Sequence, residues 1–97
     1  MKINVRFFAS LRELLGKKRE SLEFTSCNEI TVENALKRLT GLYGSEFTEY
    51  VLDRKTGEIQ SYLTLLVNGR PVNSLGGKKA KLVNGDVLAI LPPVGGG

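Results

Sequence analysis

The chain has 97 residues, of which 41% are hydrophobic and 25% charged, so we expect one globular domain with a single core. Its 14 basic and 10 acidic residues give a net charge of +4, which favours an acidic partner. The basic runs at 17–19 and 78–79 have no aromatic residues between the charges, which argues against binding of nucleic acid. No apolar run resembles a membrane span or a secretory signal, so we predict no membrane partner and a cytoplasmic location.

Cys27 is the one cysteine, and the chain contains no histidine. A single cysteine cannot form an internal disulfide, which fits a reducing compartment. Because no histidine is present to activate the thiol, we interpret Cys27 as an incidental reduced thiol. The sequence also lacks the spacing of metal ligands, a phosphate-binding glycine motif and a pair of nucleophile and base. We therefore expect no metal site, no bound cofactor and no catalytic apparatus of the chain's own.

Two strands are predicted near the start of the chain. Residues 2–8 alternate apolar and polar side chains, as in a strand with one buried face. Phe8 breaks the alternation and is expected on the face opposite the core, where a large aromatic side chain needs cover or a partner. A second alternating run over residues 19–24 predicts the second strand.

Two helices are predicted in the same half of the chain. Ser10 and Glu13 have the spacing of a capping box, which predicts a short helix that ends at Gly16. Thr31 is a suitable N-cap for the main helix. The apolar residues of this helix recur on one stripe that we expect to face the sheet: Val32, Ala35, Leu36 and Leu39.

The second half of the chain is expected to contribute strands. Residues 45–62 mix apolar and charged side chains, and we expect a loop with a short helical or extended piece there. An apolar run at 63–67 predicts a buried strand, and the Asn-Gly pair at 68–69 predicts a hairpin turn. A last strand is predicted over 87–91. This order of elements indicates an α+β fold, in which one main helix covers one face of a small mixed sheet.

The chain ends in a segment that differs from the rest. Two prolines stop the last strand because they remove backbone donors. Three glycines follow after one valine, and a tail of six residues reaches roughly 20 Å when extended, enough to enter another protein's active site. We divide the chain into a domain of residues 1–91 and an extended tail of Pro92, Pro93, Val94, Gly95, Gly96 and Gly97.

This tail resembles the Pro-Pro-Val-x-Gly-Gly ending of the ubiquitin-like sulfur carriers, especially the small subunit of molybdopterin synthase. Segments 7–13, 67–72 and 82–91 resemble the same family in the same order. Gly95 occupies the variable position and makes three glycines in place of two. The resemblance implies the β-grasp fold of ubiquitin with a flexible glycine tail, in which the first and last strands lie side by side.

The resemblance also implies a function. The carboxylate of Gly97 would be the reactive group, and Gly95 and Gly96 would thread into partner enzymes. A ubiquitin-activating-like adenylyltransferase would use ATP and magnesium to form an acyl adenylate, which sulfide or a persulfide converts into a thiocarboxylate. The large subunit of molybdopterin synthase would then pass this sulfur to a pterin precursor. The chain would thus be the small, sulfur-donating subunit of a heteromeric synthase.

A partner-binding surface follows from the pairing of the first and last strands. If Leu88 and Ile90 face the main helix, Leu91 faces the other way. Phe8 would share this open face, beside the root of the tail. We expect partner contacts from Phe8, Arg12, Leu91, Pro92, Pro93 and Val94.

Three alternatives stay open. A protein modifier would share the adenylation step but would end in an isopeptide bond between Gly97 and a lysine. A sulfur carrier for thiolation of transfer RNA or for thiamine synthesis would differ in the final acceptor. A plain β-grasp binding domain would make no chemical use of its terminal glycines.

Overall fold

The computed structural model describes residues 1–25 and 29–92, so Cys27 and the tail after Pro92 lie outside the described residues. In chain order the elements are β1 (Lys2–Phe7), α1 (Ala9–Leu15), β2 (Arg19–Glu23), β3 (Ile30–Thr31), α2 (Val32–Tyr43), α3 (Ser45–Val51), β4 (Thr64–Val67), β5 (Arg70–Pro71), the 3₁₀ turns η1 (Val72–Leu75) and η2 (Gly77–Lys79), β6 (Lys81–Leu82) and β7 (Val87–Leu91).

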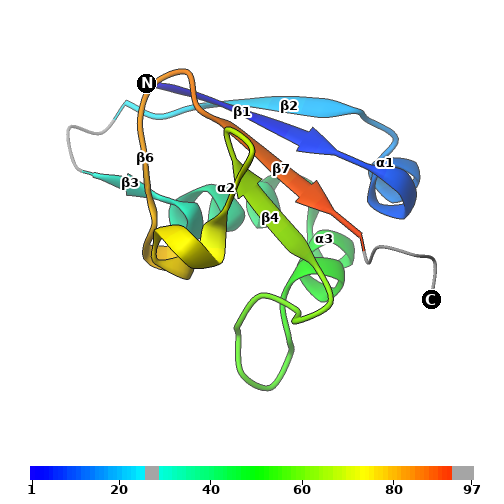
Figure 1. The fold of residues 1–97 in the computed structure, drawn as a ribbon. Helices are drawn as coiled ribbons and strands as arrows, with labels where there is room; N and C mark the ends of the chain where they lie inside the picture. The colour runs from blue at the N-terminus through cyan, green and yellow to red at the C-terminus, as the bar shows by residue number, and fades with distance from the viewer. Residues whose placement is uncertain (26–28, 93–97) are drawn as a thin grey trace.

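Five strands form one mixed sheet in the order β2-β1-β7-β4-β5, and β3 pairs with β6 in a separate small ladder. Strands β1 and β7 are parallel and place Val5 opposite Leu88, as predicted for the first and last strands. Strand β4 runs antiparallel on the other side of β7. The helices α2 and α3 lie behind this sheet in Figure 1, so one face is covered and the other is open. This arrangement confirms the β-grasp fold.

The core lies between α2 and the covered face of the sheet. All four predicted stripe residues of α2 are buried. They meet side chains of β1 and β7 that are at most 1% exposed, namely Ile3, Val5, Phe7, Leu88 and Ile90. Each such side chain contributes about 1.5–3 kcal/mol on burial. The two central strands are therefore held from one face.

The main helix begins as predicted, whereas the start of the short helix differs. Thr31 caps α2, because its Oγ1 accepts a hydrogen bond from the Asn34 backbone N–H at 3.3 Å. The predicted capping box of α1 is wrong, because the N-cap is Phe8 and makes no side-chain capping bond. Ser10 lies inside α1, where its hydroxyl forms a hydrogen bond with the Tyr50 hydroxyl. This tertiary contact competes with local capping. The helix ends at Gly16, as expected.

Residues 45–62, where we expect a loop with a short helical or extended piece, contain a third helix at their start. Helix α3 buries Phe47 and Val51 completely. The loop that follows is tied by an isolated bridge between Leu52 and Ile59. Within the described residues, no helix is both long and apolar enough to cross a membrane.

Candidate functional site: the root of the tail and the open face of the sheet

The tail leaves from a central strand. Strand β7 ends at Leu91, followed by Pro92, which has no backbone N–H to extend the ladder. Because β1 and β7 are parallel, the end of β1 and the start of α1 lie at the same edge of the sheet (Figure 1). The predicted reactive Gly97 and the other predicted tail positions, Pro93, Val94, Gly95 and Gly96, lie outside the described residues.

The open face carries the last residue of β7. Leu88 and Ile90 are buried, whereas Val87, Ala89 and Leu91 alternate with them and are half-buried. Phe8 is also half-buried, and its extended backbone follows the buried Phe7. Phe8 and Leu91 thus lie outside the core, and the strand register places both near the root of the tail.

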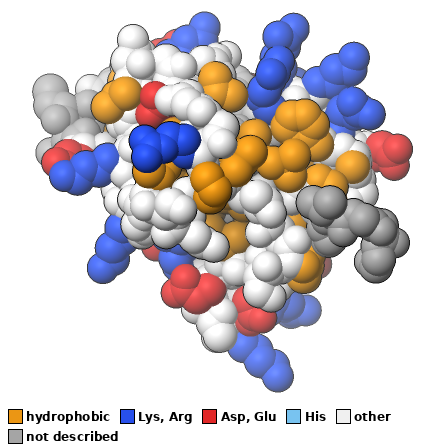
Figure 2. Space-filling view, viewed as in Figure 1, with side chains coloured by type: hydrophobic (Ala, Val, Ile, Leu, Met, Phe, Trp, Pro, Cys, Tyr) orange, Lys and Arg blue, Asp and Glu red, His pale blue; other side chains and the backbone are white. Residues whose placement is uncertain are grey.

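A strip of apolar side chains crosses this face. Ala89 stands opposite Leu66 of β4, which in turn stands opposite Pro71 of β5. Figure 2 shows hydrophobic side chains gathered on this face of the molecule, with basic side chains along one border. We call Leu66, Pro71, Val87, Ala89 and Leu91 the open-face strip. Pro71 is exposed and the other four residues are half-buried. A partly exposed apolar surface of this kind is suited to binding another protein.

Arg12 lies on α1, one helical turn after the N-cap residue Phe8. Its side chain is exposed, and it is not part of the open-face strip. The link of Arg12 to Phe8 is a long backbone hydrogen bond, in which the Arg12 N–H donates to the Phe8 carbonyl at 3.4 Å. This bond is part of α1. Arg12 stays a predicted contact at the edge of the site.

The root of the tail is supported from the covered face. The ring of Tyr43 packs edge-on against Phe7, with 5.8 Å between ring centres. The Tyr43 hydroxyl donates a hydrogen bond of 2.5 Å to the Glu20 carboxylate, so α2 is tied to β2. This bond lowers the pKa of Glu20, whereas burial and the same carboxylate raise the pKa of Tyr43. Through Tyr43, helix α2 therefore contacts both β1 and β2 on the covered face of the sheet.

The other end of β7 is fixed by two polar residues that sequence reasoning missed. Asp86 is 8% exposed, and its carboxylate accepts hydrogen bonds from the Asn68 side-chain amide at 2.9 Å and from the Val83 N–H at 2.8 Å. The Asn68 side-chain oxygen accepts a bond from the Val87 N–H at 2.9 Å. The Asn-Gly pairs at 68–69 and 84–85 are turn signals, but the sequence does not show that the two turns meet.

The described residues contain no group of three or more metal-ligating side chains, and every side chain of the open-face strip is aliphatic. What the site provides is an apolar surface beside an exit point for the chain. This arrangement is suited to docking on another protein.

Comparison with known proteins agrees with this geometry. The ThiS family matches residues 5–97. Small archaeal modifier protein 3 of Haloferax volcanii is 34% identical over 97 residues, which cover both chains completely. The crystal structure of SAMP1 from Haloferax volcanii has a TM-score of 0.83 at 27% identity and covers 100% of both chains. A putative molybdopterin converting factor, subunit 1, from Pyrococcus furiosus has a TM-score of 0.74 at 28% identity, with 97% of this chain and 99% of that chain covered. The chain therefore belongs to the ThiS family of ubiquitin-like sulfur carriers.

Proposed function

We propose that this chain carries sulfur as a thiocarboxylate on Gly97 and that an activating enzyme prepares it by adenylation. One observation carries the proposal. Strand β7 ends at Leu91 beside the open-face strip, so a partner that docks on the strip receives the tail at its edge. Docking and chemistry would then be separated, with the folded domain supplying binding energy and the tail supplying the reacting group.

The chemistry proceeds in two displacements on the partner. An oxygen of the Gly97 carboxylate attacks the α-phosphorus of ATP, and pyrophosphate leaves with magnesium. Sulfide then attacks the acyl carbon, the bond to the AMP oxygen breaks, and a thiocarboxylate remains. A persulfide serves equally if a thiol afterwards cleaves its S–S bond. A terminal glycine suits both steps because its acyl carbon is unhindered.

The open-face strip gives the partner a rigid landing surface. Leu66 and Ala89 stand opposite each other in the antiparallel ladder, so their side chains are close neighbours. Leu91 extends this surface to the root of the tail, and Phe8, the residue between β1 and α1, borders it. The partners that we infer are a ubiquitin-activating-like adenylyltransferase and the protein that receives the sulfur.

We infer the large subunit of molybdopterin synthase as that receiver, which would make this chain the small subunit of the synthase. The similarity to the putative molybdopterin converting factor, subunit 1, from Pyrococcus furiosus supports this destination. Transfer of the sulfur to a pterin precursor would return the plain carboxylate, and the carrier would be used again.

A second candidate has an observation of its own. Small archaeal modifier protein 3 is similar to this chain over its whole length at 34% identity, and its name describes a modifier. If this chain acts in that way, a lysine amine attacks the acyl adenylate, AMP leaves and an isopeptide bond forms at Gly97. Both candidates share the adenylate and differ in the nucleophile.

The test is mass spectrometry of the protein from its native cells, with a Gly97 deletion as the matched control. The proposal predicts an intact chain in which one sulfur replaces one oxygen at the terminus, and this species is absent from the control. Lysine-linked remnants of the tail on other proteins, with no sulfur-bearing free chain, would favour the modifier instead. A free chain with only the plain carboxylate, both before and after incubation with the activating enzyme, ATP and sulfide, would contradict both candidates.

A further inference from the structure

Two arginines stand opposite each other on the open face of the sheet. The antiparallel register of β1 and β2 pairs Arg6 directly with Arg19. The parallel register on the other side pairs Arg6 with Ala89 of the open-face strip. Both arginines are exposed. A charged border therefore adjoins the apolar strip along β1.

Neither guanidinium is neutralised by the described part of the chain. The ion pairs among residues 1–25 and 29–92 use other cations, namely Lys17, Arg54, Lys78 and Lys81. Glu20 follows Arg19 in the sequence and borders the same hollow as the two arginines, but in the strand register it pairs with the core residue Val5. Its carboxylate already accepts hydrogen bonds from the Tyr43 hydroxyl and the Lys17 amine.

Like charges on directly opposite strand positions oppose pairing of the strands. Among the described residues, no carboxylate forms an ion pair with Arg6 or Arg19. An arginine presents a planar fork of donors that matches a carboxylate with two bonds, so the pair is suited to acidic side chains of another protein.

The two arginines also line a hollow. It measures about 310 Å³ and is bounded by Asn4, Arg6, Arg19, Glu20, Ser21 and Val87. Its lining includes the polar residues Asn4 and Ser21, which suits a polar occupant. No aromatic side chain lines it, so a stacked nucleic-acid base has no platform there. Val87 belongs both to this hollow and to the open-face strip, which makes the two surfaces continuous.

We propose that the hollow between Arg6 and Arg19 is a subsite for an acidic segment of the activating enzyme. Carboxylates of that segment would pair with the two guanidiniums, while its neighbouring apolar residues cover Val87 and Ala89. Val87 lines the subsite, and Leu91 lies four residues further along β7 at the root of the tail. At the rise of a β-strand, the two residues are roughly 13 Å apart. This inference rests on the proposed adenylation. It adds that the segment of the activating enzyme that docks here is acidic.

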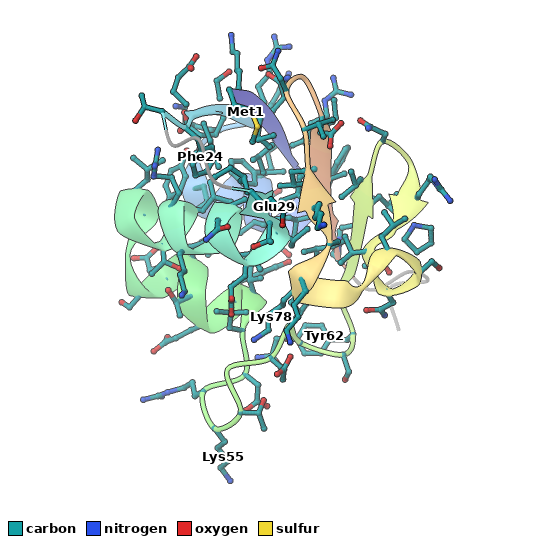
Figure 3. All side chains as sticks on the ribbon, turned by 90° about the vertical axis from the view of Figure 1, so that its left-hand side faces the viewer. Met1, Phe24, Glu29, Lys55, Tyr62 and Lys78 are labelled. Atoms are coloured by element: carbon teal, nitrogen blue, oxygen red, sulfur yellow. The ribbon has the colours of Figure 1, made fainter. Side chains whose placement is uncertain are left out.

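The experiment reverses both charges with Arg6→Glu and Arg19→Glu in one variant. The matched control is Lys55→Glu with Lys79→Glu, which changes the net charge by the same amount. Lys55 lies at the tip of a loop and points away from the domain (Figure 3), and Lys79 belongs to η2, which packs against α2. Adenylation by the cognate enzyme is followed by pyrophosphate release. For the arginine variant, KM at low salt should rise by about tenfold or more, with kcat unchanged.

The control should keep KM within about twofold, and added salt should shrink the effect of the arginine variant because it screens exposed charges. Equal values of KM for the two variants, with the parent chain adenylated normally, would overturn the subsite and leave the proposed function standing. If the parent chain itself is not adenylated, the proposed function fails.

A second experiment tests the subsite independently of adenylation. A synthetic peptide of alternating glutamate and leucine is titrated into the parent chain at low salt. The amide resonances of Arg6, Arg19 and Val87 should shift, and these shifts should be lost in the arginine variant and kept in the control. Shifts spread over all basic regions, or shifts that survive in the arginine variant, would contradict the proposal.

Discussion

The side-chain amide of Asn68 donates a hydrogen bond of 2.9 Å to the carboxylate of Asp86 and thereby joins the β4–β5 turn to the residue that precedes β7. The backbone N–H of Asn68 donates to the Val87 carbonyl at 2.9 Å, and the Asn68 side-chain oxygen accepts from the Val87 N–H. Asn68 adopts a positive φ of 51°, as a turn before Gly69 requires. These bonds set where β7 starts, and hence where its last residue delivers the tail.

Asp86→Ala should destabilise the fold by about 1–3 kcal/mol, because it leaves the Val83 N–H and the Asn68 amide without their acceptor. For a domain of this size the melting temperature should fall by roughly 4–8 °C for each kcal/mol. Thermal unfolding measures the change. Glu49→Ala, at an exposed position of α3, is the control and should stay within about 0.5 kcal/mol. Equal melting temperatures for the two variants would show that Asp86 does not hold the start of β7.

Leu91→Asp should weaken binding to the activating enzyme by about tenfold or more, because it places a charge in the middle of an apolar contact. Phe8→Asp should act in the same direction. Both residues lie outside the buried core, so the melting temperature should change little. Affinity is measured by calorimetry. Leu42→Asp, at a 55% exposed position of α2, is the control and should bind normally. A collapse of the fold in Leu91→Asp would mean that this side chain packs structurally.

Arg19→Glu alone should raise stability and lower partner affinity together. It converts a pair of like charges across β1 and β2 into a pair of opposite charges, and such exposed pairs are worth about 0.2–1 kcal/mol. The partner's carboxylates would at the same time lose one guanidinium. Urea unfolding and binding are measured on the same preparation. A less stable variant, or a more stable one that binds normally, would contradict the idea that this pair is kept for binding.

Tyr43→Phe should change how stability depends on pH. The hydrogen bond from Tyr43 is the main cause that lowers the pKa of Glu20, with a smaller contribution from Lys17. A lowered carboxyl pKa stabilises the fold above the pKa of the unfolded chain, about 4.3, and this stabilisation is lost as the pH falls through the folded pKa. The parent should therefore exceed the variant in stability near neutral pH, and the difference should shrink in acid. Urea unfolding over a pH series measures it, and a difference that grows in acid would contradict the assignment.

Cys27→Ser should leave sulfur transfer intact, because the sulfur in the proposed cycle is bound to the Gly97 acyl group and the chain has no histidine to activate a thiol. Formation of the thiocarboxylate with the activating enzyme, ATP and sulfide is the measurement. A folded Cys27→Ser chain that accepts no sulfur would require a role for this thiol.

The sequence was most informative where a local rule and the tertiary structure agree. The stripe of α2 and the Thr31 cap follow from spacing alone, and the prolines after Leu91 mark the end of β7. The sequence-based prediction failed where a contact between residues far apart in the chain determines the role of a side chain. Ser10 looks like a cap, but it bonds with Tyr50, 40 residues away. The alternation of apolar and polar residues places Arg6 on the face of the sheet opposite the core. Its pairing with Arg19 depends on the register of β1 and β2, which composition does not encode.

The most direct test of the central claim is adenylation by chains whose tail is one residue shorter or longer. Deletion of Gly97 withdraws the carboxylate by roughly 3.5 Å, and a misplacement of about 1 Å can already cost a hundredfold in rate. One residue added after Gly97 displaces the carboxylate in the opposite direction. Pyrophosphate release with the cognate activating enzyme should be lost in both variants, while both melt at the temperature of the parent chain. Normal adenylation of the shortened chain would contradict the carrier function, and a loss of melting temperature together with activity would mean that the tail is part of the fold.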